Sequence, residues 1–280
     1  MKQRCTQRTV ALALLVISAD AHAEASHHQG ASPGPMSLAG LDRLASTQMQ
    51  QNWDTRAFFS YLDATRKFGH DGTRAPLVGD GSVRNLGVNG FVERRFGDRW
   101  AASVLTGGQM LRVRASGTTD TVWSLADSVL TGRVALPVGA AHVAIPVSLK
   151  IPGTYPESEA TGAKQIDQET RIVIAVPAVL PRVSLVAGVG YKLRLGGIAD
   201  EITPALIVPV LLIDRLTATL LATGGIAVGP GTRKDSLAPG AMLTWRMTGS
   251  LDLSAAYYRT IYGHNVVDAH IATLGVGAAF

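Results

Sequence analysis

The sequence contains little of what many proteins use to hold a fold together. Its single cysteine, Cys5, excludes a disulfide framework. It also lacks a run of about 18 apolar residues free of charge and proline, which a membrane-spanning helix needs. The most apolar stretch, residues 172–190, is interrupted by Pro177, Pro181 and Arg182. Yet 46% of the 280 residues are hydrophobic and only 17% are charged. This hydrophobicity therefore indicates a structure other than transmembrane helices.

The stretch Val183–Leu195, VSLVAGVGYKLRL, indicates what that structure is. Every second residue from Val183 onward is apolar, whereas the residues between them include Lys192 and Arg194. A period of two places these two sets on opposite faces of a strand, while a helix would spread the charges around its circumference. The segment is therefore predicted to be a strand whose apolar face contacts either a protein core or lipid.

Similar alternation recurs along the rest of the chain, with turn residues between the apolar segments. The predicted strands are 55–66, 82–95, 99–112, 124–136, 141–152, 166–180, 182–195, 200–213, 215–228, 236–247, 251–262 and 268–280. Short links follow the even-numbered strands, and most of the other links are longer, as at 67–81, 113–123 and 153–165. This alternation is typical of outer-membrane barrels. The sequence therefore predicts an all-β fold, a transmembrane antiparallel up-and-down β-barrel of about twelve strands.

Charge placement separates the two faces of these strands. Charged residues are absent from the apolar parity of the fourth, fifth and sixth predicted strands, where lipid contact would make each Arg or Lys cost about 2–4 kcal/mol at mid-membrane. The residues predicted to face the lumen and line a solute path are Asp127, Arg133, Lys150, Asp167, Glu169, Arg171, Lys192, Arg194, Arg246 and Asp252. A soluble β-sandwich would also alternate, but it would not need strands this long or alternating loop lengths.

Aromatic residues are predicted at both membrane interfaces and in the lumen. Trp100, Trp245 and Phe280 fall at the periplasmic ends of lipid-facing parities, and Tyr191 and Tyr257 fall near the extracellular ends. Such residues favour the two headgroup levels. The residues predicted to face inward, as an apolar path beside the charges, are Phe59, Tyr61 and Phe91.

The sixth and seventh predicted strands allow a more local prediction. A two-residue turn at 181–182 would place Glu169 opposite Arg194 and Arg171 opposite Lys192. The expected result is one salt bridge with two flanking cations near the extracellular mouth, and a modest preference for anions. A solvated charge ladder without selectivity is the alternative.

The N-terminus indicates export. Basic residues precede a short apolar run at 10–19, and Ala21-His22-Ala23 places small residues where signal peptidase cleaves. We therefore expect a signal peptide at 1–23, a flexible extension or small plug at 24–52 and the barrel at 53–280. Without residues 1–23 the chain is only weakly basic, which argues against a nucleic-acid partner.

The C-terminal strand adds a signal of its own. Phe280 is preceded at every second position by apolar residues, from Ala278 back through Val276 and Leu274 to Ala272. This arrangement resembles the closing strand of bacterial outer-membrane proteins. The resemblance implies recognition by the barrel-assembly machinery and location in the outer membrane.

Three segments also resemble a known family, namely Asn85–Gly107, Ser124–Leu136 and Val147–Gly153. They are similar to successive strands of the outer-membrane transporter family named for the meta-pathway of phenol degradation. The matching positions are Asp98-Arg99, Asp127 with Gly132, and Pro152-Gly153. Ser124 and Ala126 stand where that family usually has glycines, and its aromatic-Gly pair before the first turn is missing. The resemblance implies uptake of small hydrophobic or aromatic molecules, distantly like the long-chain fatty-acid channel group, and identifies no substrate-binding residue.

Motifs for catalysis are not evident in the sequence. It has no Gly-x-Ser-x-Gly elbow, no His-Glu-x-x-His and no cysteine-based metal site. We therefore expect no enzyme activity, no cofactor and no metal, with a small-molecule solute and outer-membrane lipid as partners. The function favoured is a channel for passive uptake. The alternatives are a non-transporting structural or adhesive barrel and, third, an outer-membrane enzyme.

Overall fold

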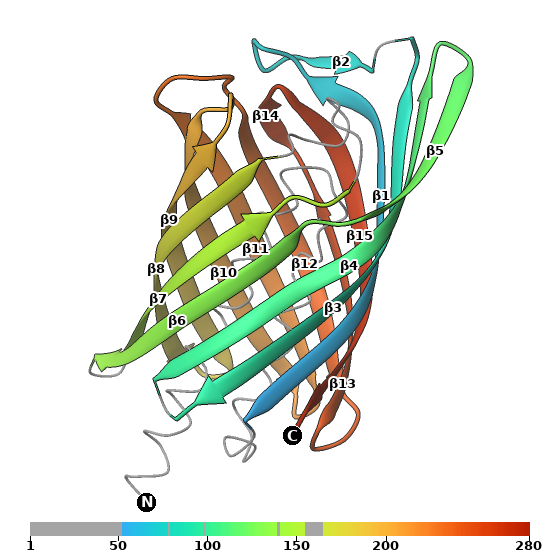
Figure 1. Ribbon diagram of the computed structural model, residues 1–280. Helices are drawn as coiled ribbons and strands as arrows, with labels where there is room; N and C mark the ends of the chain where they lie inside the picture. The colour runs from blue at the N-terminus through green and yellow to red at the C-terminus, as the bar shows by residue number, and fades with distance from the viewer. Residues whose placement is uncertain (1–51, 78, 98, 139–140, 155–164) are drawn as a thin grey trace, which may run out of the picture.

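The computed structural model describes residues 52–280, except 78, 98, 139–140 and 155–164 (Figure 1). The predicted signal peptide, and the predicted extension apart from Asn52, lie outside the described residues. Within the described part, no helix has the length and apolar character needed to cross a membrane.

The described residues form one closed antiparallel sheet (Figure 1), so the predicted β-barrel is confirmed. Twelve strands make its wall, in chain order around the barrel, with the β11–β12 and β1–β15 pairings completing the circle. These are β1 (Trp53–Phe68), β3 (Ser82–Phe96), β4 (Trp100–Ala115), β6 (Ser128–Val138), β7 (Ala141–Ile151), β8 (Ile166–Leu180), β9 (Val183–Leu195), β10 (Asp200–Ile213), β11 (Leu216–Val228), β12 (Asp235–Arg246), β13 (Leu251–Arg259) and β15 (Val266–Ala279). The additional strands are β2 (Arg74–Pro76), β5 (Thr118–Leu125) and β14 (Tyr262–His264).

The two ends of the barrel differ. At one end, called the turn end, tight links join the strands, such as 181–182 and 214–215. The C-terminus lies here too (Figure 1), where Trp53 and Phe280 exchange backbone hydrogen bonds of 2.9 and 3.0 Å that fasten β1 to the last residue. The opposite end, called the loop end, carries the longer links and the additional strands. Short turns at one end and longer loops at the other match outer-membrane barrels.

The predicted fourth strand, 124–136, begins too early. Residues 118–125 instead form β5, which folds back on β4 through a tight turn at Ser116 and Gly117, with φ of 49° and 83°. Two successive residues with positive φ are typical of a type I′ hairpin turn. The resulting β4–β5 hairpin extends the loop end (Figure 1), and the wall resumes at Ser128.

The predicted strand 251–262 is also divided. β13 ends at Arg259, and β14 then pairs with the start of β12, with Asp235 opposite His264. Backbone hydrogen bonds from Thr260 to Ala269 and from Ile261 to Leu237 hold the connection in place. Alternation alone could not indicate this break, because apolar residues continue through it.

The predicted register of β8 and β9 is wrong by two positions in most of the hairpin. Leu180 does lie opposite Val183 across the expected turn, but Glu169 lies opposite Lys192 and Asp167 opposite Arg194. The register shifts between Val176 and Leu180. Pro177 in this segment has no N–H to donate to the ladder, and Ala178 adopts φ of 52°, so the extra residues bulge.

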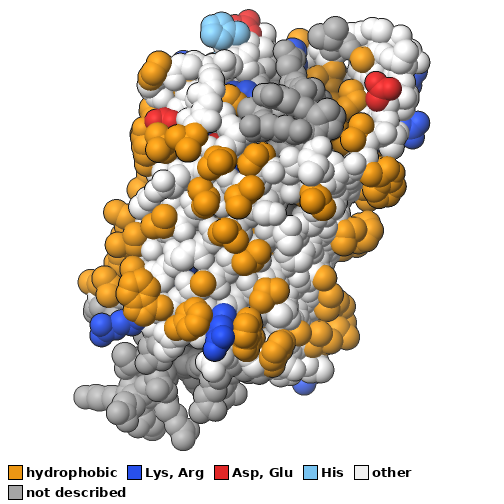
Figure 2. All heavy atoms as spheres, in the orientation of Figure 1, with side chains coloured by type: hydrophobic (Ala, Val, Ile, Leu, Met, Phe, Trp, Pro, Cys, Tyr) orange, Lys and Arg blue, Asp and Glu red, His pale blue; other side chains and the backbone are white. Residues whose placement is uncertain are grey.

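Side chains alternate between the two faces of the wall. Exposed apolar side chains cover the middle of the outer surface, and basic side chains lie toward the turn end (Figure 2). The aromatic residues predicted at the interfaces, Trp100, Tyr191, Trp245, Tyr257 and Phe280, are all exposed on this surface.

The prediction that Phe59 and Tyr61 face inward is wrong. Their side chains are 54% and 40% exposed on the outer surface, whereas Phe58 between its polar neighbours on β1 is buried inside. Asp54 and Arg56 fix this parity, because a barrel wall keeps charged side chains away from lipid. Strand alternation then turns every odd-numbered residue outward.

Candidate channel lumen

The charged residues predicted for the lumen do gather inside the barrel. The buried ones are Asp127, Arg133, Lys150, Asp167, Glu169, Arg171, Lys192, Arg194 and Asp252, and Arg246 is partly buried. One set lies near the loop end, on β7, β8, β9 and the link before β6, and Glu201 of β10 joins it. The other set lies near the turn end and contains Arg133, Arg246 and Asp252.

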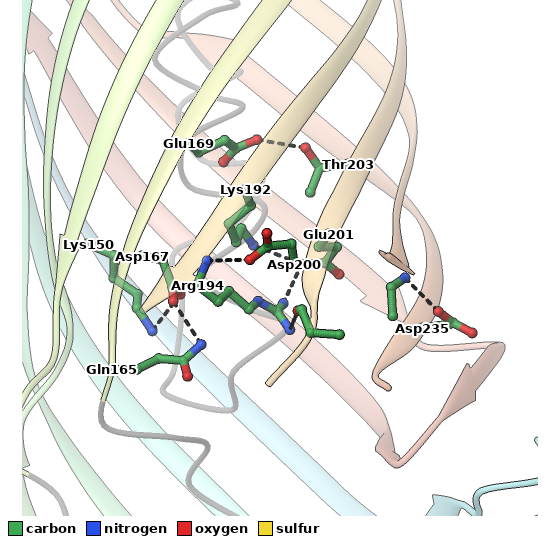
Figure 3. A network of polar contacts seen from close by, with 12 residues as sticks. Lys150, Gln165, Asp167, Glu169, Lys192, Arg194, Asp200, Glu201, Thr203 and Asp235 are labelled. Atoms are coloured by element: carbon green, nitrogen blue, oxygen red, sulfur yellow. Dashed lines mark hydrogen bonds and ion pairs between the residues drawn. The ribbon is translucent and has the colours of Figure 1, made fainter. Parts of the chain in front are cut away.

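Glu201 is the central acid of the loop-end set (Figure 3). It starts β10 opposite Lys192 of β9, whose Nζ lies 3.2 Å from Glu201 Oε2. The same carboxylate oxygen also pairs with Arg194. One carboxylate therefore neutralises much of the charge of two lumen cations.

A second part of the loop-end set is built around Asp167 (Figure 3). Lys150 Nζ lies 2.8 Å from Asp167 and 3.7 Å from Asp127, and Gln165 donates to Asp167 at 2.9 Å. Asp127 also accepts a hydrogen bond of 2.9 Å from the backbone N–H of Gly153. Asp127 thus ties the start of β6 to the end of β7.

Glu169 completes this set. Its carboxylate accepts hydrogen bonds from Arg171 on the same strand and, at 2.7 Å, from Thr203 of β10. The predicted arrangement of one salt bridge with two flanking cations is therefore wrong. Lys192 and Arg194 pair with Glu201 on the next strand, so the expected anion preference cannot rest on uncompensated cations.

Two lumen-facing glycines make room for these carboxylates. A Cβ at Gly190 would lie 2.3 Å from Glu169 Oε1 and 2.5 Å from Thr203 Oγ1, and a Cβ at Gly225 would lie 1.6 Å from Glu201 Oε1. Real atoms cannot approach so closely, so the network needs hydrogen at both positions. Gly190 and Gly225 therefore provide the space that the two carboxylates occupy.

We expect Gly190→Ala to disturb the network. The new methyl group would displace Glu169 from Thr203 or force the strands apart, at a cost of about 1–3 kcal/mol in unfolding free energy, typical of overpacking. Urea unfolding of the barrel in lipid, followed by tryptophan fluorescence, would measure this loss. Gly90→Ala is the matched control, because its Cβ would meet nothing within 4 Å. Equal stability of both variants would contradict the proposed role of Gly190.

The turn-end set has its own acids. Glu93 on β3 pairs with Arg133 at 2.7 Å and with Arg95 at 3.2 Å, and Asp54 pairs with Arg56 at 2.9 Å. Sequence analysis missed Glu93, Asp54, Arg56 and Glu201 as lumen residues. For Glu201 the strand alternation could have indicated the lumen, because Ile202, Pro204 and Leu206 form the apolar parity of this strand and Glu201 lies on the opposite one.

The wall across the barrel from β7–β10 has large apolar side chains inside, together with polar ones such as Asn85, Asn89 and Gln109. Buried inward residues of β1, β3, β4, β13 and β15 include Phe58, Leu62, Phe91, Leu105, Tyr258 and Ile271. Leu62, Tyr258 and Ile271 belong to one packed cluster with Leu111 and Val267. The strand order places β1 across the barrel from β9 and β3 across from β10. The larger buried aromatic and aliphatic side chains of the lumen therefore lie mostly across the barrel from the Glu201 network, and Phe91 is one of them.

Comparisons with known proteins support the fold. No protein-family model matches the sequence, and no curated protein is significantly similar to it. Among solved structures, an outer membrane channel from Pseudomonas putida F1 has a TM-score of 0.60 at 12% identity, covering 82% of this chain and 96% of that chain. The NanC porin has a TM-score of 0.52 at 11% identity, covering 81% and 100%.

A third solved structure, the KdgM porin in complex with disordered oligogalacturonate, has a TM-score of 0.51 at 8% identity, covering 81% of this chain and 99% of that chain. At such identities the likeness establishes the barrel architecture of outer-membrane channels and porins. The sequence resemblance to the meta-pathway transporter family stays a prediction.

Proposed function

We propose that this protein is a bacterial outer-membrane channel for the passive uptake of small hydrophobic or aromatic molecules. The observation that supports the proposal is that aromatic rings and paired charges both lie inside the barrel. Phe58, Phe91 and Tyr258 are inward-facing aromatic residues, and the charges around Glu201 form ion pairs on β9 and β10. A solute ring that carries one polar group suits an interior that contains both kinds of side chain.

The paired state of the charges also supports uptake of weakly charged solutes. Unpaired cations would hold an anion tightly, and a passive channel needs binding weak enough for release. Glu201 compensates Lys192 and Arg194, and Asp167 compensates Lys150, so the path is polar without a strong net field. The resemblance to the meta-pathway transporter family supports the same solute class.

Liposome uptake is the test of the solute class. Purified protein would be reconstituted, and entry of benzoate, benzyl alcohol and glucose would be compared by swelling rate. We expect benzyl alcohol and benzoate to enter several times faster than glucose, because only they carry an apolar ring. Equal rates for all three, or faster entry of glucose, would contradict the hydrophobic or aromatic specificity.

A further inference from the structure

Three arginines on the outer surface have no place in the lumen. They are Arg84 on β3 and Arg112 and Arg114 on β4, all exposed at the loop end. They share the outward parity of the exposed apolar residues Leu86 and Val104. Figure 2 shows basic side chains at the right edge of the loop end, where Figure 1 places the β4–β5 hairpin.

Their pairing register brings like charges together. Arg84 lies directly opposite Arg112, and Asp63 of β1 lies opposite Arg84 on its other side. Arg84 Nε donates to Asp63 Oδ1 at 2.9 Å. Within the described ranges, the side chains of Arg112 and Arg114 make no hydrogen bond or ion pair. Like charges directly opposite each other destabilise a strand pair unless an anion lies between them.

The position of this row relative to the aromatic residues indicates the kind of anion. Tyr61 and Tyr257 are exposed on the outer surface and share a level through Ala272 of β15. Arg84 is opposite Asp63, two residues beyond Tyr61 toward the loop end, or about 7 Å along the strand. Tyrosines on a barrel wall favour the headgroup level. The arginines therefore project at or just beyond the headgroups of the leaflet at the loop end.

We propose that Arg84, Arg112 and Arg114 bind the phosphate groups of an outer-leaflet glycolipid, lipopolysaccharide. A guanidinium presents a planar fork of donors that matches phosphate, and such bidentate pairs are stronger than neutral hydrogen bonds. Exposed Tyr61 and Leu86 lie just below, where the acyl chains of the same lipid would contact them. A free phosphate ion would gain nothing from those side chains. The inference rests on the outer-membrane location in the proposed function.

Binding of lipid A to the folded protein in detergent micelles tests this inference. Lipid A would be titrated against the wild type and R84Q/R112Q, with bound lipid counted by native mass spectrometry. We expect about tenfold weaker binding for each arginine removed. R94Q is the matched control, because Arg94 is also outward but lies at the turn end, 5.1 Å from the rings of Trp53 and Phe96. It should bind lipid A like the wild type.

Two further ligands distinguish the source of the phosphate. Dephosphorylated lipid A should bind the wild type as weakly as lipid A binds R84Q/R112Q, and millimolar inorganic phosphate should not displace lipid A. Equal binding of lipid A by the wild type and R84Q/R112Q would overturn the inference, and so would displacement by free phosphate. Conductance of the same samples separates the two proposals. A conducting barrel without lipid A binding overturns only this inference, whereas a protein that never folds into a membrane overturns both.

Discussion

Replacing Glu201 with glutamine is expected to shift the channel toward anion selectivity and to destabilise it. The substitution keeps the shape of the side chain but removes the carboxylate that pairs with Lys192 and Arg194. All three side chains are buried. Breaking a buried ion pair by removing one partner typically costs about 3–5 kcal/mol, because the remaining charge loses its compensation. The uncompensated positive charge should also attract anions into the lumen.

Two measurements check this prediction. The zero-current potential in a salt gradient should move toward the anion equilibrium potential, and urea unfolding in lipid should occur at lower denaturant. Asp214→Asn is the control, because it removes the same charge from an exposed position in the turn between β10 and β11. A folded Glu201→Gln barrel with an unchanged zero-current potential would contradict the assignment of this network to the conducting path.

Replacing Leu220 with arginine is expected to impair insertion of the barrel into lipid. Leu220 is 59% exposed on the outer surface of β11, and Leu216 on the same strand lies opposite the exposed Trp245 at the turn end. Four residues span about 13 Å along a strand, so Leu220 falls near the middle of an apolar band about 25 Å tall. An arginine there costs about 2–4 kcal/mol.

Two variants serve as controls for this prediction. Leu220→Gln tests the loss of the apolar side chain without a charge, and Thr219→Arg puts the same charge on the buried inner face one residue away. Folding into lipid vesicles can be followed by the heat-modifiable mobility of barrels on gels. Equal folding of Leu220→Arg and Leu220→Gln would show that the outer surface is not a lipid contact.

The wall was predictable because lipid and lumen select side chains in opposite ways. In Val183–Leu195 every residue of the outward parity is apolar, and both charged residues lie on the inward parity. The strand bounds and the burial of these charges agree with that pattern. The register between strands was less accessible. Pro177 and Ala178 shift β8 against β9 by two residues, and alternation before and after a bulge of this kind looks the same. For that reason Arg171 was predicted opposite Lys192, where the structure has Glu169.

The lumen was predictable only in part. The predicted lumen residues included both cations of β9, whereas Glu201, although inside the predicted strand 200–213, was not identified as their partner. The orientation of Phe59 was ambiguous because β1 has aromatic residues on both parities, Phe58 and Phe59 being adjacent. Asp54 and Arg56, which are buried on the same parity as Phe58, show which parity is inside. The placement of Phe58 and Phe91 across the barrel from the Glu201 network required the closed strand order, which one sequence does not contain.

Conductance across a planar lipid bilayer tests directly whether this barrel is an open passive channel. Purified protein, shown to be folded by its heat-modifiable mobility, would be added to one side under an applied voltage. We expect stepwise conductance increases for the wild type and an altered zero-current potential for Glu201→Gln. A folded, inserted barrel that gives no conductance at any voltage would contradict the proposed channel function.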